Sequence, residues 1–271
     1  MTVDVGKYGP WALIVGASDG VGAAFAEALA QGGLNVLLVA RRRQLLAEVA
    51  TGIAQRHGVQ TRTVAVDLTE PGAANTVIDT ASDLDIGFLV YCAGADPDFK
   101  PFLDNSITAA EAMVQRNCVV PMQLCHALAP AMVQRGAGAI VILGSGAGFV
   151  GGPNMVAYGA SKAFDMVFAE ALWCELRDTG VDVIGLILGK TDTPALRRLE
   201  HERGQIGSTE QVPPGAAPVE RAVATALNNL SNGPTVYVGD EITGAAQLFA
   251  SMGRNESVAF MAQAISAAMG K

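Results

Sequence analysis

Short runs of apolar residues alternate with longer segments of helical periodicity along most of this chain. Runs of Val, Ile and Leu that are apolar on both faces are typical of strands buried in a parallel sheet between two helical layers. The expected strands are residues 11–15, 35–40, 61–66, 86–91, 139–143, 181–188 and 235–238. The expected helices are residues 20–31, 43–56, 73–81, 107–135 with an interruption, 157–178 and 218–230.

This alternation predicts an α/β fold class. Strands separated by helices of this length favour right-handed βαβ crossovers, and therefore a doubly wound parallel sheet with helices on both faces. No repeat or linker interrupts the pattern, so we expect residues 1–271 to form a single domain. Residues 200–218 are charged and then rich in Gly and Pro, with little periodicity. We expect a lid at about 192–218, and a solvated insertion without a role is the alternative.

Composition excludes several classes of protein. With 18 Lys and Arg against 26 Asp and Glu, the formal net charge of −8 argues against nucleic acid or an anionic membrane as the main partner. The four cysteines have no metal-ligand spacing with the three histidines, so we expect no metal site and reduced, mostly buried thiols. Glycines and a proline break the long uncharged segment 136–161, which disfavours a membrane span. A cytoplasmic location is expected.

A glycine-rich turn follows the first expected strand and opens the first long helix. Glycines at such a turn let the backbone approach a pyrophosphate, and the helix N-terminus offers unpaired N–H groups with a positive dipole charge. The spacing is G-x3-G-x-G, and its place directly after the first strand favours nucleotide binding. The residues expected to contact the cofactor here are Gly16, Ser18, Asp19, Gly20, Val21 and Gly22.

The residues after the second strand indicate which nicotinamide cofactor would bind. A carboxylate usually holds the adenosine ribose of NAD at this position, but this chain has Ala40 followed by Arg41, Arg42 and Arg43. Without an anion to repel it, a 2′-phosphate can bind there and pair with guanidinium groups. We therefore predict NADP(H), with Arg41 and Arg42 carrying the preference. Solvated basic residues are the alternative, although positive charge is unfavourable at a helix start.

Further residues fall at spacings that resemble one enzyme family. They are Asp67, the turn Cys92-Ala93-Gly94, Asn117, Ser145 and the run Tyr158-Gly159-Ala160-Ser161-Lys162. Together with the glycine turn they resemble the classical short-chain dehydrogenases/reductases over nearly the whole chain, which implies a single Rossmann-type domain. Within the family, residues 7–11 and 151–162 look most like bacterial NADP-dependent hydroxysteroid dehydrogenases of the 7β type.

Four of these residues are the expected catalytic set: Asn117, Ser145, Tyr158 and Lys162. Tyr158 and Lys162 are four apart and share a helix face, where an ammonium favours the phenolate. Tyr158 would protonate a carbonyl oxygen that Ser145 polarises. The resemblance implies that Lys162 also binds the nicotinamide ribose and that Asn117 holds a water for proton relay. Each of these residues could instead have a structural role only; Ser145, for example, could cap the loop in which it lies.

The resemblance adds further cofactor contacts. Asp67 and Leu68 match the pair that contacts adenine, and the backbone at Ala93 and Gly94 lines the same site. The chain departs from the family pattern in having Cys92 for the usual Asn and Leu188 for the usual Pro. Cys92 is expected to replace a bracing hydrogen bond by packing. The nicotinamide carboxamide would be held by Gly189, Thr191 and Thr193.

We therefore expect an NADPH-dependent oxidoreductase that interconverts a ketone and a secondary alcohol. The apolar residues Phe149, Met155, Leu196, Leu199 and Ile206 suggest a bulky apolar substrate, steroid-like or cyclic, with core packing as the alternative. By resemblance, helices 107–135 and 157–178 would form the interface of a homodimer or homotetramer.

Two other functions stay open. A 3-oxoacyl thioester reductase would need a basic docking patch, for which Arg197, Arg198 and Arg203 are candidates. A non-catalytic NADP(H)-binding sensor is disfavoured because it would not need the four catalytic residues.

Overall fold

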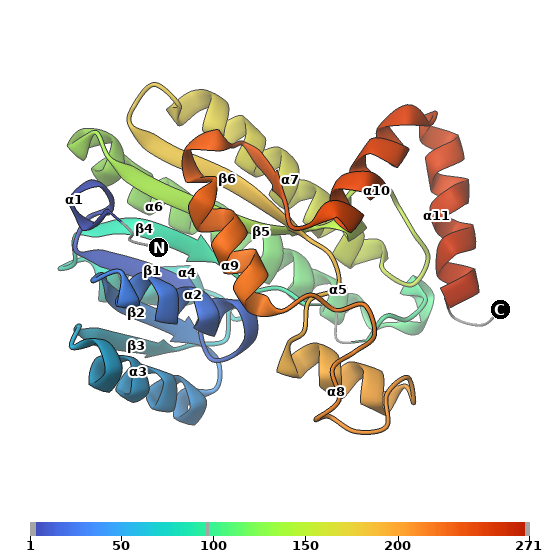
Figure 1. Ribbon diagram of the computed structural model, residues 1–271, viewed down its shortest axis with the longest axis horizontal. Helices are drawn as coiled ribbons and strands as arrows, with labels where there is room; N and C mark the ends of the chain where they lie inside the picture. Colours follow the sequence, from blue (N-terminus) through green and yellow to red (C-terminus); the bar gives the residue numbers. More distant parts are fainter. Residues whose placement is uncertain (1–3, 96–97, 269–271) are drawn as a thin grey trace.

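A computed structural model describes residues 4–95 and 98–268, with a seven-stranded sheet at the centre (Figure 1). The strand order is β3-β2-β1-β4-β5-β6-β7, and all neighbouring strands are parallel. The strands are β1 (Trp11–Val15), β2 (Asn35–Ala40), β3 (Thr61–Ala65), β4 (Ile86–Tyr91), β5 (Gly138–Ser145), β6 (Val181–Leu188) and β7 (Thr235–Tyr237). The predicted fold class is confirmed.

Helices cover both faces of this sheet. One layer contains α2 (Gly20–Gln31), α3 (Arg43–His57) and α9 (Val219–Asn228). The other contains α4 (Ala73–Ala81), α5 (Ile107–Val114), α6 (Val120–Arg135) and α7 (Val156–Leu176). Successive side chains of β1 point into opposite layers, so Leu13 belongs to one buried cluster and Ile14 to the other. Each such fully buried side chain stabilises the fold by about 1.5–3 kcal/mol.

The sheet reverses its winding between β1 and β4. The chain first proceeds from β1 to β2 and β3 on one side, and then returns to place β4 on the other side of β1. Ligands of doubly wound sheets bind outside the carboxyl ends of the strands at such a reversal. In Figure 1, α8 (Pro194–Glu202), α10 (Asp240–Ser251) and α11 (Arg254–Ala268) lie beyond these carboxyl ends.

Three features differ from the sequence expectations. The interruption expected within 107–135 is a π-helical turn at Gln115–Val119 between α5 and α6, not a break. Helices α10 and α11 were not predicted; α10 has no buried residue, and α11 has little apolar periodicity. The expectation of mostly buried thiols is wrong: Cys125 is buried, Cys92 and Cys118 are half-buried, and Cys174 is exposed on α7. None of the helices in the described part of the chain has the length and apolar character that a bilayer crossing requires.

A surface network joins α2 to α3. Arg56 donates from Nε and Nη2 to the two carboxylate oxygens of Glu27, at 2.9 and 2.6 Å, and His57 Nε2 lies 2.7 Å from Oε1. The hydrogen bond from Arg56 outweighs partial burial and lowers the pKa of Glu27 to about 2. Because the pKa is lower in the folded chain, the network stabilises the fold above about pH 4.5, and this contribution is lost as the pH falls towards 2.

Glu27→Gln tests this linkage. At pH 7 we expect a decrease of only about 0.5–1 kcal/mol in the free energy of unfolding, since water screens this exposed pair. Urea denaturation at pH 7 and at pH 3 measures the difference from the unmodified protein, which should shrink at the lower pH. Glu175→Gln, on the exposed side of α7, is the matched control. An equal loss at both pH values would contradict this assignment.

Candidate active site

The glycine turn between β1 and α2 is packed too closely for side chains. Gly16 has φ +91°, and a Cβ there would lie 2.9 Å from the backbone nitrogen of Ala93. A Cβ on Gly22 would lie 2.2 Å from the carbonyl oxygen of Gly16. The N-terminus of α2 therefore begins directly against the turn, where its unpaired N–H groups face the crevice.

A cleft of about 720 Å³ opens at this turn. It extends from the end of β2 to the start of α7, along the carboxyl ends of the central strands. All the residues predicted from the sequence to bind the cofactor line it: Gly16, Ser18, Asp19, Gly20, Val21, Gly22, Arg41, Arg42, Asp67, Leu68, Ala93, Gly94, Tyr158, Lys162, Gly189, Thr191 and Thr193. Ser145 lines it too.

Arginines gather at the β2 end of the cleft. Arg42 Nη2 donates to Ser18 Oγ at 2.9 Å and to Asp19 Oδ2 at 2.5 Å. Arg198, which was not among the predicted cofactor contacts, lies 3.9 Å from the same Asp19 oxygen. Arg41 Nη1 is 3.5 Å from Asp67 Oδ2. This end of the cleft is therefore cationic, with hydroxyl and guanidinium donors side by side.

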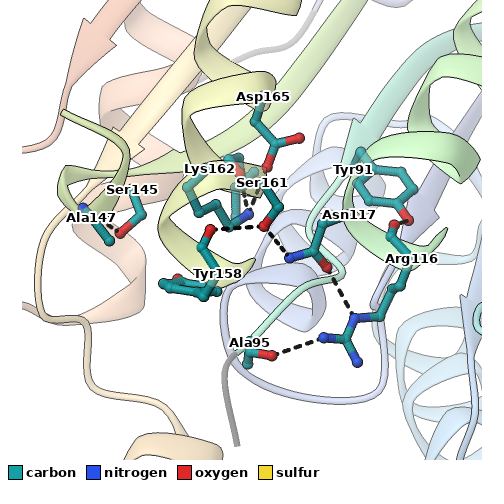
Figure 2. Close-up of polar contacts among 11 residues, drawn as sticks. Tyr91, Ala95, Arg116, Asn117, Ser145, Ala147, Tyr158, Ser161, Lys162 and Asp165 are labelled. Atoms are coloured by element: carbon teal, nitrogen blue, oxygen red, sulfur yellow. Dashed lines mark hydrogen bonds and ion pairs between the residues drawn. The ribbon is translucent and has the colours of Figure 1, made fainter. Parts of the chain in front are cut away.

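Ser145, Tyr158 and Lys162 meet at the other end (Figure 2). Ser145 ends β5, and its Oγ accepts from the backbone nitrogen of Ala147 at 3.2 Å, so it does cap the following turn. Its hydroxyl hydrogen is not used in that bond. Lys162 Nζ lies 6.0 Å from the centroid of the Tyr158 ring, and it donates to the carbonyl oxygen of Leu143 at 2.8 Å. This last bond ties α7 to β5.

Asn117 is the one predicted catalytic residue that does not line the cleft. It lies in the π-helical turn, fully buried, and its Nδ2 donates to Ser161 Oγ at 2.8 Å. Ser161 in turn donates to the carbonyl oxygen of Tyr158 at 2.8 Å. The Oδ1 atom of Asn117 accepts from Arg116 Nε at 3.1 Å. The Asn117 side chain therefore connects the π-helical turn to the start of α7, as Figure 2 shows.

A second, smaller cavity of about 280 Å³ adjoins Tyr158. Met155 lines it, with other apolar side chains that include Phe102, Met113 and Val156. Its wall also has polar and charged residues: Arg41, Thr69, Asp98, Lys100, Asn105, Arg116 and Asn154. Of the other residues expected to line a substrate pocket, Leu196 lines the larger cleft and Leu199 lines neither.

The expectation that Phe149 and Ile206 line a substrate pocket is wrong. Phe149 packs against Tyr237 and Phe249, with ring centroids 6.0 and 6.2 Å apart, and Ile206 is buried in the segment after α8. For these two, packing explains the apolar character.

The expected basic patch is largely engaged in internal contacts. Arg197 makes a bidentate ion pair with Asp192, at 2.6 and 2.7 Å. Arg203 donates to the carbonyl oxygen of Asp98 at 2.9 Å. Arg198 is thus the member of the predicted trio that faces the cleft, near Asp19.

The segment expected as a lid begins with α8. Thr193 Oγ1 caps this helix by accepting from the nitrogen of Leu196 at 3.1 Å. Lys190 Nζ pairs with the buried Glu200 at 2.6 Å and also donates to the carbonyl oxygen of Pro214 at 2.9 Å. These contacts attach the segment to the end of β6, beside the cleft.

Comparison with known proteins identifies the family. A model of the short chain dehydrogenase family matches residues 10–204. The chain belongs to this family. It is therefore an oxidoreductase, and the resemblance inferred from the sequence is confirmed.

Individual relatives of this short chain dehydrogenase include a 7beta-hydroxysteroid dehydrogenase of Collinsella aerofaciens. It is 40% identical over 190 residues, which cover 70% of this chain and 72% of the relative. A solved structure from a study of 7beta-hydroxysteroid dehydrogenase stereoselectivity has a TM-score of 0.85 and 34% identity, and the match covers 95% and 98% of the two chains. The short-chain dehydrogenase from Sphingobium yanoikuyae in complex with NADPH has a TM-score of 0.75 and 30% identity, with 90% and 96% covered.

Sequence reasoning missed two charged residues of this dehydrogenase. Arg116 lines both cavities and donates from Nη2 to the carbonyl oxygen of Ala95 at 2.8 Å. Asp165 is buried on α7 and forms an ion pair with Lys162. The available signal was a charge within an apolar helical stretch, because charged side chains are almost never fully buried unless paired.

Gly148 lets α7 pack against the turn that follows Ser145. A Cβ on Gly148 would lie 2.6 Å from the backbone carbon of Lys162 and 2.7 Å from the nitrogen of Ala163. Gly148→Ala should therefore lower the free energy of unfolding by about 1–3 kcal/mol, as overpacking does. Gly151→Ala, where a Cβ meets nothing within 4 Å, is the matched control. Urea denaturation that shows the same stability for both variants would contradict this packing.

Proposed function

We propose that this short chain dehydrogenase uses NADP(H) to interconvert a ketone and a secondary alcohol, with Asn117, Ser145, Tyr158 and Lys162 as the catalytic set. One observation carries the proposal. The side chains of Ser145, Tyr158 and Lys162 line the same cleft as the glycine turn between β1 and α2. A nucleotide that binds at the turn would therefore extend towards the three side chains.

The residues of the cleft fit NADP(H). The glycine turn places the N-terminus of α2 at the cleft, where its N–H groups would bind a pyrophosphate, and Ser18, Arg42 and Arg198 supply donors for a 2′-phosphate. Asp67 and Leu68 would contact the adenine. The backbone at Ala93, Gly94, Gly189 and Thr191, with Thr193, would line the nicotinamide half. When bound, NADPH supplies the hydride, and the NADPH complex of the Sphingobium yanoikuyae relative supports this choice.

The protein supplies the proton and holds the carbonyl group. Ser145 donates a hydrogen bond to the ketone oxygen, and Tyr158 transfers its hydroxyl proton to that oxygen as the alcohol forms. The Lys162 ammonium stabilises the resulting phenolate, which then regains a proton from solvent. Asn117 acts by holding Ser161 and the start of α7. In the oxidative direction the phenolate takes the proton back.

We propose a bulky apolar ketone as the substrate, steroid-like or otherwise cyclic. The apolar side chains Phe102, Met113, Met155 and Val156 on the wall of the cavity beside Tyr158, and the 7beta-hydroxysteroid dehydrogenase relative, support this class. The segment 192–218 would cover the bound substrate, since it begins where Leu196 lines the cleft. The guanidinium groups of Arg197 and Arg203 are bonded to Asp192 and to the carbonyl oxygen of Asp98. This disfavours an acyl carrier as a partner, because its docking would need free basic groups.

The proposed assembly is a homodimer or homotetramer in the cytoplasm. Exposed apolar side chains on α5, α6 and α7 support an interface there: Val114, Met122, Val133 and Val167. Burial of such side chains between subunits would remove them from water. The acidic net charge of −8 is consistent with a small-molecule enzyme rather than a nucleic-acid-binding protein.

Tyr158→Phe tests the proposed function. NADPH and NADH oxidation would be followed with steroid ketones, small cyclic ketones and an acetoacetyl thioester. We expect NADPH-linked turnover of steroid or cyclic ketones, and a decrease of about 10²–10⁴-fold in kcat in the variant, with the Kd for NADPH unchanged. Tyr237→Phe, on β7, is the matched control and should keep its activity, because Tyr237 lines neither cavity.

Two results would contradict the proposal. Preferred turnover of the thioester would make the protein a 3-oxoacyl thioester reductase. Tight NADPH binding without turnover of any of these ketones would favour a sensor.

Ala40→Asp tests the cofactor preference separately. Ala40 ends β2 at the mouth of the cleft, so a carboxylate there would repel a 2′-phosphate and accept hydrogen bonds from a ribose. The ratio of kcat/KM for NADPH to that for NADH should fall by at least about tenfold. Arg43→Ala, an exposed change at the first residue of α3, is the control. An unchanged ratio in Ala40→Asp would exclude this position from cofactor selection.

A further inference from the structure

Helix α8 begins directly against the glycine turn. A Cβ on Gly20 would lie 3.1 Å from Cγ2 of Thr193, the residue that caps α8. Ala195 and Arg198 follow in the helix, and both line the large cleft. Residues three apart share a helix face, so Arg198 lies on the same side of α8 as Ala195. This helix therefore presents a cation to the cofactor cleft.

Arg198 is held much less firmly than the arginine before it. Arg197 makes two short contacts with Asp192, at 2.6 and 2.7 Å. Among the described residues, the one ion pair of Arg198 is with Asp19, at 3.9 Å, and the Arg198 side chain is 49% exposed. A long contact between exposed groups contributes little to stability. Arg198 can therefore turn towards another anion in the cleft without losing a strong interaction.

Asp19 marks a place where the chain holds an anion from two sides. Its Oδ2 accepts from Arg42 at 2.5 Å and lies 3.9 Å from Arg198, although Arg42 follows β2 and Arg198 belongs to α8. With Arg41, three guanidinium groups stand here against two carboxylates, those of Asp19 and Asp67. This end of the cleft is therefore net positive, and the N-terminus of α2 adds to that charge.

The donors that remain for a further anion lie between β2 and α8. Within the described part of the chain, Arg42 bonds Ser18 and Asp19 through Nη2 alone, so its Nε–H and Nη1–H groups remain for another acceptor. Three other cations line the cleft, and each donates to an oxygen of the chain at 2.9 Å or less: Arg116, Lys162 and Lys190. A phosphate is therefore best bound between Arg42 and Arg198.

We propose that Arg198 binds the 2′-phosphate of NADP(H) from the side of α8, and that this contact fastens the segment 192–218 over the cleft. The inference rests on the proposed function, because it takes NADP(H) as the cofactor. A dianion between Arg42 and Arg198 joins the end of β2 to α8 by charge-assisted hydrogen bonds, which are stronger than the long contact with Asp19. NAD(H) lacks this phosphate, so it leaves α8 held by the contacts of the chain alone.

The contact with the phosphate sets the size of two effects. A hydrogen bond to a charged group contributes about tenfold in affinity, and this is the expected loss when Arg198 is removed. A ligand shifts a conformational equilibrium by as much as its affinity differs between the two states. The 2′-phosphate should therefore suppress the opening of α8 by up to about tenfold.

The experiment compares NADP⁺ with NAD⁺, which differ only in the 2′-phosphate, on the full-length protein. By calorimetry, Arg198→Met should weaken NADP⁺ binding about tenfold and leave NAD⁺ binding unchanged. Hydrogen–deuterium exchange at saturating nucleotide should be up to about tenfold slower in residues 194–205 with NADP⁺ than with NAD⁺, and Arg198→Met should abolish this difference.

Two further variants control for charge and for the site of the change. Arg198→Lys keeps the charge and should retain part of both effects, since an ammonium also binds phosphate. Arg177→Met removes an exposed guanidinium group at the end of α7, outside both cavities, and should change neither the affinities nor the exchange.

Failure of this inference is distinguishable from failure of the proposed function. If the unmodified protein binds NADP⁺ no more tightly than NAD⁺, the cofactor choice of the proposed function is wrong and the inference is overturned with it. If NADP⁺ is preferred, three results overturn the inference alone: Arg198→Met keeps the full preference, weakens both nucleotides equally, or leaves the exchange difference in α8 unchanged. Neither measurement needs a ketone, so an absence of turnover counts only against the proposed reaction.

Discussion

The parallel sheet reverses its winding between β1 and β4, and the position of every candidate catalytic and cofactor-binding residue depends on that reversal. Because successive crossovers diverge there, the carboxyl ends of the central strands open into a cleft rather than a packed interface. The glycine turn lies after β1, Ala40 at the end of β2, and Ser145 at the end of β5. Residues far apart in the sequence thus line one space of about 720 Å³.

A buried polar network fixes α7, which carries Tyr158 and Lys162, against this cleft. Lys162 donates to the carbonyl oxygen of Leu143 on β5, while Asn117 reaches α7 through Ser161. The π-helical turn at Gln115–Val119 interrupts the regular ladder between α5 and α6, a feature often found at functional sites. Since unpaired buried groups are unfavourable, such a network permits few alternative arrangements of α7.

The sequence predicted the sheet and the residues that line the cleft, but not the polar network. Strands such as β1 and β4 are buried along their whole length, so their apolar runs stand out. The glycine turn and the Tyr158–Lys162 spacing were also visible, since both are local patterns. Helices α10 and α11 were not predicted: few of their residues are buried, and the apolar periodicity of α11 is weak.

The side-chain contacts within the site could not be predicted from the spacing of residues in the sequence. Phe149 lies near Ser145 in the sequence, yet its ring packs against Tyr237 and Phe249 and not against a cavity. Asn117 faces Ser161 because the π-helical turn changes the direction of its side chain relative to a regular helix. Asp165 lies only three residues after Lys162, but their ion pair depends on how deeply α7 is buried.

A crystal structure with bound NADP⁺ would test the central claim most directly, namely that one cleft holds the cofactor and the catalytic side chains together. The account predicts the pyrophosphate at the Gly16–Gly22 turn, the 2′-phosphate within hydrogen-bonding distance of Ser18 and Arg42, and the nicotinamide beside Tyr158. A nucleotide bound away from this turn, or a nicotinamide remote from Tyr158 and Ser145, would contradict it.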